Sequence, residues 1–147
     1  MTHRADQIID AVVAALEANA SLGATVYPHR ALSLSDDESE LPAIGVTYGE
    51  DRAGEVALGG IVYSEMDVQL TAVAVGATEA AVRTALLEIR AQSHIAMMTS
   101  TSLGLSFVHG TFYGGATAPE LDVGEQIIGA LVSTWRVRYE MPYNDPR

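Results

Sequence analysis

The chain has 147 residues, a formal charge of −11 and 48% hydrophobic residues, which predicts one folded domain, residues 1–147, rather than disorder. All eight basic residues are arginine and there is no cysteine. Disulfides, thiolate zinc sites, cysteine nucleophiles, P-loop lysines and Schiff-base chemistry are therefore excluded. The acidic charge disfavours adhesion to the DNA backbone, no apolar run is long enough for a membrane helix, and the charged N-terminus disfavours a secretory signal.

The first part of the chain predicts one helix and two strands. Residues 2–20 carry an apolar stripe at helical spacing, and a short strand follows over residues 25–27. Pro28 cannot donate a ladder hydrogen bond, so this strand lies at a sheet edge or ends there. Residues 41–48 predict the next strand, with Tyr48 on the same face as its apolar residues.

The centre of the chain, residues 61–100, predicts one long strand that leads into one long helix. From Val62 onward apolar and polar residues alternate, which is typical of a strand with one buried and one solvated face. Gly76 ends this strand, and Thr78 offers a side-chain oxygen as helix N-cap. Apolar residues at helical spacing then predict that the helix packs one stripe on the sheet.

The last part of the chain predicts two more strands. One covers residues 103–112, with His109 on its apolar side, and a glycine pair breaks it. A loop over residues 116–124 then precedes a long strand over residues 125–141, which places Trp135 on the apolar face, as a core residue. Strands in mixed order with two helices indicate an α+β fold: a mixed, mainly antiparallel sheet of four to five strands packed by two helices.

Two acidic segments are candidate interaction loops. They contribute Asp36, Asp37, Glu38 and Glu40 from the first segment, and Glu50, Asp51 and Arg52 from the second. The first segment is most simply a solvated loop, because it lacks the glycine and the acid spacing of a calcium loop. The second begins a glycine-rich connection, residues 49–60, which we expect to be a mobile hairpin tip with no phosphate-binding spacing.

The residues alone predict no catalytic, cofactor or metal site. The four histidines form none of the spacings that bring two imidazoles to one metal. Glu65 and Asp67 share one face of the long central strand, as a catalytic acid pair could. Arg136 and Arg138 alternate in the same way on the final strand. We therefore expect these four residues to form cross-strand ion pairs, worth about 0.2–1 kcal/mol each.

A set of segments occurs in a fixed order along the chain. They are an N-terminal helix, residues 26–30 ending in arginine, residues 41–46 (LPAIGV) followed by Gly49-Glu50-Asp51, the long strand and helix over residues 62–98, Leu103-Gly104-Leu105, and the closing residues 135–139 (WRVRY). Their order resembles one protein family, the tail terminator proteins of long-tailed phages, or lambda minor tail protein U group. Residues 99–102 (TSTS) depart from it, because the family has an Asp-Pro type of turn there. The resemblance covers nearly the whole chain through element order and spacing.

This resemblance implies a structural virion protein without enzymatic activity or cofactor. Such a protein is made in the host cytoplasm and assembles as a ring, usually a hexamer, that caps the tail tube. It then presents a face to the head, so its expected partners are further copies of itself, the tail tube protein and a head-completion or neck protein. A hexamer would carry six times the formal charge of −11, and an acidic bore lets DNA pass without specific binding.

Two alternatives stay open at this point. One is a closely related role as a head–tail connector or completion protein of the neck. The other belongs to a different class: a small α+β ligand-binding or enzymatic domain with Glu65, Asp67 or His109 in a pocket. A ring of defined mass supports the assembly protein, whereas a monomer with a ligand in a pocket supports the binding domain or enzyme.

Overall fold

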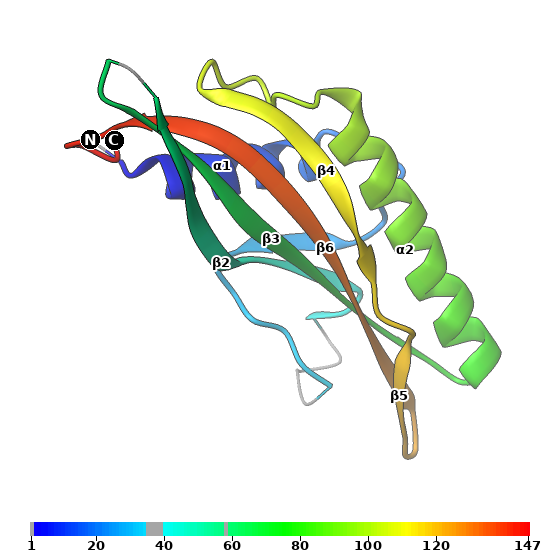
Figure 1. The fold of residues 1–147 in the computed structure, drawn as a ribbon. Helices are drawn as coiled ribbons and strands as arrows, with labels where there is room; N and C mark the ends of the chain where they lie inside the picture. The colour runs from blue at the N-terminus through cyan, green and yellow to red at the C-terminus, as the bar shows by residue number, and fades with distance from the viewer. Residues whose placement is uncertain (1, 35–39, 58) are drawn as a thin grey trace.

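A computed structural model of the protein describes residues 2–34, 40–57 and 59–147 (Figure 1). The elements in chain order are α1 (Arg4–Glu17), β1 (Thr25–Pro28), β2 (Ala43–Ala57), β3 (Ile61–Gly76), α2 (Glu79–Thr99), β4 (Val108–Ala116), β5 (Glu120–Val123) and β6 (Ile127–Pro142). They form one mixed sheet of order β1-β2-β3-β6-β4, with β5 also paired to β6. The α+β class is confirmed, and the sheet has six strands rather than four to five.

Strands β3 and β6 form the centre of the sheet. They pair antiparallel without a register shift, from Ile61 opposite Pro142 to Gly76 opposite Ile127. Because side chains alternate between the faces of a strand, one face of this pair is mostly apolar, with buried Ser64 and Ser133 as polar members. Buried residues of that face include Met66, Leu70, Leu131, Val137 and Tyr139. The long alternating patterns in the sequence therefore specify the two central strands.

Both described helices pack against this apolar face (Figure 1). Thr78 caps α2, because its Oγ1 accepts a hydrogen bond of 3.1 Å from the backbone N–H of Ala81. Gly129 of β6 lets α2 approach closely, since a Cβ there would lie 2.5 Å from Cγ1 of Val82 and 2.9 Å from Cδ1 of Leu86. Neither helix is long and apolar enough to span a membrane.

Strand β2 is longer than the sequence predicts. Its pairing with β3 continues to Ala57, so the prediction of a hairpin loop over residues 49–60 is wrong. Two register shifts, after Tyr48 and after Ala53, interrupt the pairing. Glycines that indicate a turn in the sequence lie at these irregularities of a continuous strand. Tyr48 is 47% exposed although it shares a face with buried Val46, and it lies beyond the last pair of β1 with β2, Pro28 opposite Val46.

The segment after α2 also differs from the prediction. Residues 101–106 form a turn in which Leu103 and Gly104 both have positive φ, so the strand predicted over residues 103–112 begins later. Strand β4 passes through Gly115 with a register shift, and the prediction that the glycine pair ends it is wrong. The predicted loop over residues 116–124 contains β5, which pairs with β6.

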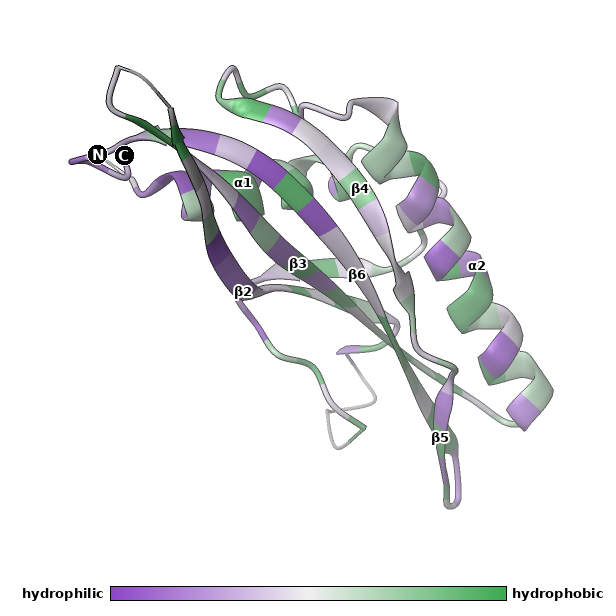
Figure 2. Cartoon of the chain, in the orientation of Figure 1, coloured by the Kyte–Doolittle hydropathy of each residue, from purple (hydrophilic) through white to green (hydrophobic). Residues whose placement is uncertain are grey.

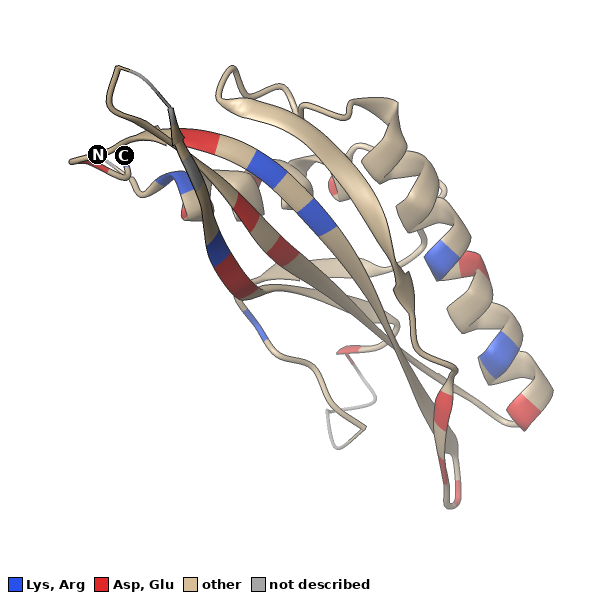
Figure 3. Cartoon of the chain, viewed as in Figure 1, with Lys and Arg blue, Asp and Glu red and all other residues tan. Residues whose placement is uncertain are grey.

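The face of the sheet opposite the helices is covered at one end by the segment that follows β1. Leu32 packs there against Ala43 and Val73 in a second, small apolar cluster. Gly45 makes this possible, because a Cβ at that position would lie 2.2 Å from the backbone oxygen of Arg30. Beyond this cluster the face carries charged residues such as Arg52, Asp67 and Arg136. Figures 2 and 3 show hydrophilic and charged positions along β2, β3 and β6. We call that uncovered part the open face.

Candidate functional site

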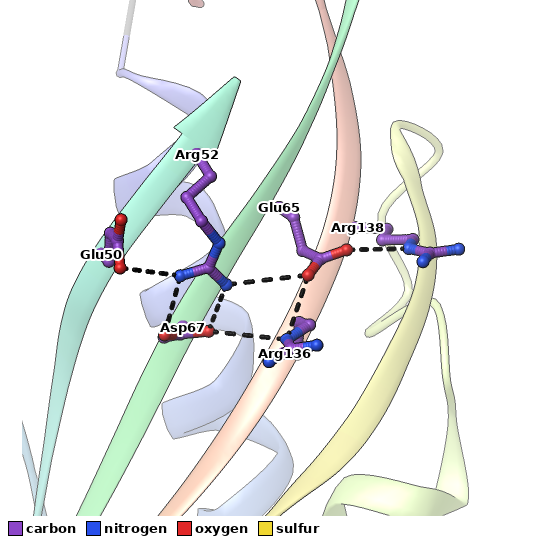
Figure 4. Close-up of polar contacts among 6 residues, drawn as sticks. All are labelled: Glu50, Arg52, Glu65, Asp67, Arg136 and Arg138. Carbon is purple, nitrogen blue, oxygen red and sulfur yellow. Dashed lines mark hydrogen bonds and ion pairs between the residues drawn. The ribbon is translucent and has the colours of Figure 1, made fainter. Parts of the chain in front are cut away.

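Six charged side chains from three adjacent strands meet on the open face (Figure 4). They are Glu50 and Arg52 of β2, Glu65 and Asp67 of β3, and Arg136 and Arg138 of β6. The register opposes Glu65 to both Arg52 and Arg138. Asp67 lies opposite Arg136. We call these six residues the arginine–carboxylate cluster.

Glu65 joins the two arginines of β6. Its Oε1 lies 3.0 Å from Nε of Arg136, and its Oε2 lies 3.0 Å from Nε of Arg138. Arg136 is directly opposite Asp67 in the register, but their side chains are 3.8 Å apart, so the stronger contact runs diagonally. The four residues predicted to form cross-strand ion pairs are therefore in contact, with Glu65 as the shared acceptor.

Arg52 holds Asp67 from the other side. Its two terminal nitrogens donate to the two carboxylate oxygens of Asp67 at 2.9 and 3.2 Å, the bidentate geometry that makes such pairs specific. Glu50 also accepts from Arg52 at 3.0 Å, and Glu65 lies 3.6 Å away. The hydrogen bond from Arg52 lowers the pKa of Asp67, while partial burial opposes that shift. The same bond raises the pKa of Arg52.

The arginine–carboxylate cluster has no formal net charge, since it contains three arginines and three carboxylates. Each exposed pair stabilises the fold by no more than about 1 kcal/mol. The pairs do hold the side chains in fixed positions, although Arg136 and Arg138 remain 51% and 63% exposed. The hydrogen bond from Arg52, which lowers the pKa of Asp67, favours the charged form of this carboxylate.

Aromatic side chains border the cluster on the β4 side. Arg138 lies over the ring of Phe112 at 5.3 Å, and Phe112 is 49% exposed. His109 packs edge-on against Tyr63 at 5.6 Å and lies 3.1 Å from the carboxylate of Glu140. The sequence pattern did not single out Phe112 or Tyr63, because an exposed aromatic on a strand has the same residue type as a buried one.

A hollow of about 480 Å³ lies between these aromatic residues and the cluster. Its lining includes Tyr63, Glu65, His109 and Arg138. Two of the residues considered for a catalytic or ligand pocket, Glu65 and His109, are therefore brought together, whereas Asp67 does not line the hollow. Glu65 forms ion pairs with three arginines, which leaves it less available to a ligand.

The predicted interaction loops have different outcomes. Asp36, Asp37 and Glu38 lie outside the described residues, while Glu40 pairs with Arg30 at 2.6 Å. The second segment is not a loop, because Glu50, Asp51 and Arg52 belong to strand β2, and Asp51 and Arg52 pair with residues of β3.

Asp51 faces the helix side of the sheet, unlike its two neighbours. Its Oδ2 accepts a hydrogen bond of 2.6 Å from the hydroxyl of buried Tyr139. Burial raises the pKa of Tyr139, and the bond to Asp51 acts in the same direction. Asp51 therefore anchors β2 to the core rather than contributing to the open face.

Trp135, His94 and His3 make structural contacts. Trp135 is 1% exposed and packs against the rings of Tyr113 and His94, each 5.1 Å away. His3 caps α1, because its Nδ1 accepts from the backbone N–H of Ala5 at 3.0 Å. Over the described part of the chain, no group of three or more His, Asp or Glu residues is arranged to hold a metal ion.

Arg52, like Glu50, is a member of the cluster that the sequence assigned to the wrong kind of segment. Its alternation with Glu50 was a usable signal, since residues two apart share a face of a strand. The glycines around it instead indicated a loop.

Comparison with known proteins adds no assignment: no protein-family model matches this chain, and no curated protein matches its sequence.

Proposed function

We propose that this protein is a structural assembly subunit of a phage tail, similar to a tail terminator, and acts without catalysis or cofactor. Several copies form a ring, usually a hexamer in that family, which caps the tail tube and provides the surface that joins the head. In this proposal the protein resides in the tail or neck of the virion. Its partners are the tail tube protein and a head-completion or neck protein.

The observation that carries the proposal is the open face with its arginine–carboxylate cluster. Arginine and aromatic residues are enriched in protein–protein interfaces, and Arg136, Arg138 and Phe112 are exposed together here. The pairs with Glu65 and Asp67 hold the arginines in place, so little side-chain entropy remains to be lost on binding. Ring closure requires two different patches on each subunit, and the open face supplies one of them.

Charge supports a protein partner over DNA at this face. The arginines of the cluster are matched by carboxylates, and the whole chain has a formal charge of −11. Phosphate binding depends on clustered positive charge that displaces counterions, which a balanced cluster does not provide. A ring of such subunits would let DNA pass through its bore without specific binding.

The test is the mass of the purified protein, alone and mixed with tail tubes, by light scattering and negative-stain electron microscopy. We expect a closed ring, or a ring that forms on the end of the tube. The double variant Arg136→Glu/Arg138→Glu should keep its fold and lose ring formation or tube binding. Arg147→Glu is the matched control, because Arg147 is 50% exposed and lies outside the cluster. The proposal is contradicted if the purified protein is a monomer and does not bind tail tubes.

The hollow beside His109 favours one competing candidate, a small-molecule binding domain. That candidate predicts a monomer whose ligand affinity falls in His109→Ala and Tyr63→Ala. Binding to isolated heads rather than to tail tubes would instead identify a neck completion protein.

A further inference from the structure

Helix α2 exposes large apolar side chains on the surface turned away from the sheet. Leu87, Ile95 and Met98 are 48%, 57% and 41% exposed. At about 100° per residue, these three and Ala91 fall within one strip of helix surface, roughly opposite the buried stripe that contains Leu86. Apolar segments recur along α2 in Figure 2. We call Leu87, Ala91, Ile95 and Met98 the outer strip, since the core does not use them.

An apolar groove lies directly beside the outer strip, between α1 and the end of α2. It has a volume of about 720 Å³, and its lining includes Ile95 together with Ala11, Ala14, Ala15 and Ala18 of α1. Alanines leave room for larger side chains that enter from outside. A row of projecting side chains and a recess that fits such a row therefore sit side by side on one surface. This arrangement is self-complementary, as a two-fold contact between identical chains requires.

Arginines and carboxylates border this surface on opposite sides, and Glu88 of α2 lies between them next to the outer strip. Arg83 and Arg90 lie along the outer strip on the side away from the groove, by their helical positions. Asp10 and Glu17 lie on the far side of the alanines of α1. Each pair is separated by two helical turns, or about 10 Å. When α2 of one copy lies over α1 of another, two arginines face two carboxylates at the same spacing.

We propose that the outer strip and the groove form a two-fold interface between two copies of this chain. The outer strip of each copy enters the groove of the other, and the arginines of α2 meet the carboxylates of α1 (Figure 3 shows the charges on both helices). The interface lies on the helices, on the other side of the sheet from the open face. It does not depend on the proposed ring, which closes through two different patches.

The first test introduces a charge into the outer strip. Ile95→Glu places a carboxylate where an apolar contact is expected, so association weakens about ten-fold or more. Sedimentation or light scattering should show particles of half the wild-type mass, given 15.6 kDa per chain. Val123→Glu is the matched control, because Val123 is 62% exposed and lies on β5. It should keep the wild-type mass, and circular dichroism checks that both variants fold.

The second test exchanges the charges. Arg83→Glu with Arg90→Glu opposes like charges across the interface and should weaken association about ten-fold. Arg90 also donates to the hydroxyl of Tyr113 at 2.5 Å, so the melting temperature of this variant is measured as well. Adding Asp10→Arg and Glu17→Arg to the same chain restores opposite charges in both halves of the pair. Association should then return to within about three-fold of wild type.

Three results overturn the interface. They are a wild-type mass of one chain at every concentration, a folded Ile95→Glu variant with the wild-type mass, and a charge exchange without recovery. If the protein forms a ring without the two-fold contact, Ile95→Glu leaves the mass of the ring unchanged. If it forms two-fold pairs without a ring, Ile95→Glu reduces the particle to the mass of a single chain. Failure of this inference and failure of the proposed ring therefore give different masses.

Discussion

The two faces of the β3–β6 pair come from the same strands but differ in burial and in the contacts that they make. On the helix side, alternate residues such as Met66 and Trp135 are buried and make the core. On the open face, the residues between them, such as Asp67 and Arg136, remain partly exposed and make ion pairs. Apolar burial is worth about 1.5–3 kcal/mol per large side chain, whereas an exposed ion pair is worth about 1 kcal/mol or less. Stability therefore resides mainly on one face, which leaves the other available for the partner contacts that we propose.

The largest expected effect is on the helix side, at Trp135. Trp135→Ala should destabilise the protein by about 3–5 kcal/mol, because a large cavity replaces the ring packed on Tyr113 and His94. Trp135 Nε1 has no hydrogen-bond partner within the described residues. Trp135→Phe removes that unpaired donor and should cost less than about 1.5 kcal/mol. Urea unfolding measures both; a loss below about 1 kcal/mol for the alanine variant would contradict core packing.

Gly129 tests how closely the core packs against α2. Gly129→Val should destabilise by about 1–3 kcal/mol, because its Cβ would overlap Val82 and Leu121. Gly49→Ala is the control on the open face, where the nearest atom to a new Cβ is 3.5 Å away in Gln69. Thermal unfolding should leave the control almost unchanged. If both variants lose the same amount of stability, the two glycines are needed for backbone conformation and not for packing against the helix.

Asp67 tests the open face through pH. Its folded-state pKa lies below the unfolded value of about 3.9, so its pairing stabilises the fold above that pH and is lost as pH falls through the folded value. Asp67→Asn should cost about 1 kcal/mol at neutral pH and almost nothing near pH 2. Denaturant unfolding across that range, with exposed Asp122→Asn as control, measures the difference. A loss that is independent of pH would mean that packing, not charge, is disturbed.

The smallest effect on stability is expected in the acidic segment before β2. Neutralising Asp36, Asp37, Glu38 and Glu40 together should change the free energy of unfolding by under about 0.5 kcal/mol per substitution. Under the proposed function, tail assembly or joining to the head should nevertheless fall. Infectivity and tube binding are the measurements. If tails with all four acids neutralised assemble normally and deliver DNA, the segment is only a solvated connection and has no role in assembly.

Period-two alternation was enough to predict β3 and β6, because a strand with one buried face leaves a long and unambiguous pattern. It also placed Glu65, Asp67, Arg136 and Arg138 on one face before any register was known. The capping residue Thr78 was equally readable, since its hydroxyl needs only a local backbone donor. These signals are local to one element or to its regular repeat.

Glycine was the main source of error. Around Gly49 and Gly54 it indicated a turn, whereas long-range pairing with β3 keeps β2 extended through its bulges. The turn at Leu103 is the opposite case, because a leucine with φ of 54° has no local sequence signal. The hollow beside His109 could not be predicted from the sequence either. It brings together residues of β3, β4 and β6, which become neighbours only through the order of strands in the sheet.

The continuous pairing of β3 with β6 has a consequence for how the chain folds during synthesis. Even the closest partners, Gly76 and Ile127, are separated by α2, β4 and β5. One edge of β3 therefore stays open until β6 has left the ribosome, although β2 already pairs with the other edge. Contacts of such long sequence separation form slowly, and an open strand edge invites pairing with other chains. Translation that pauses before β6 would hold the nascent chain in its most aggregation-prone form.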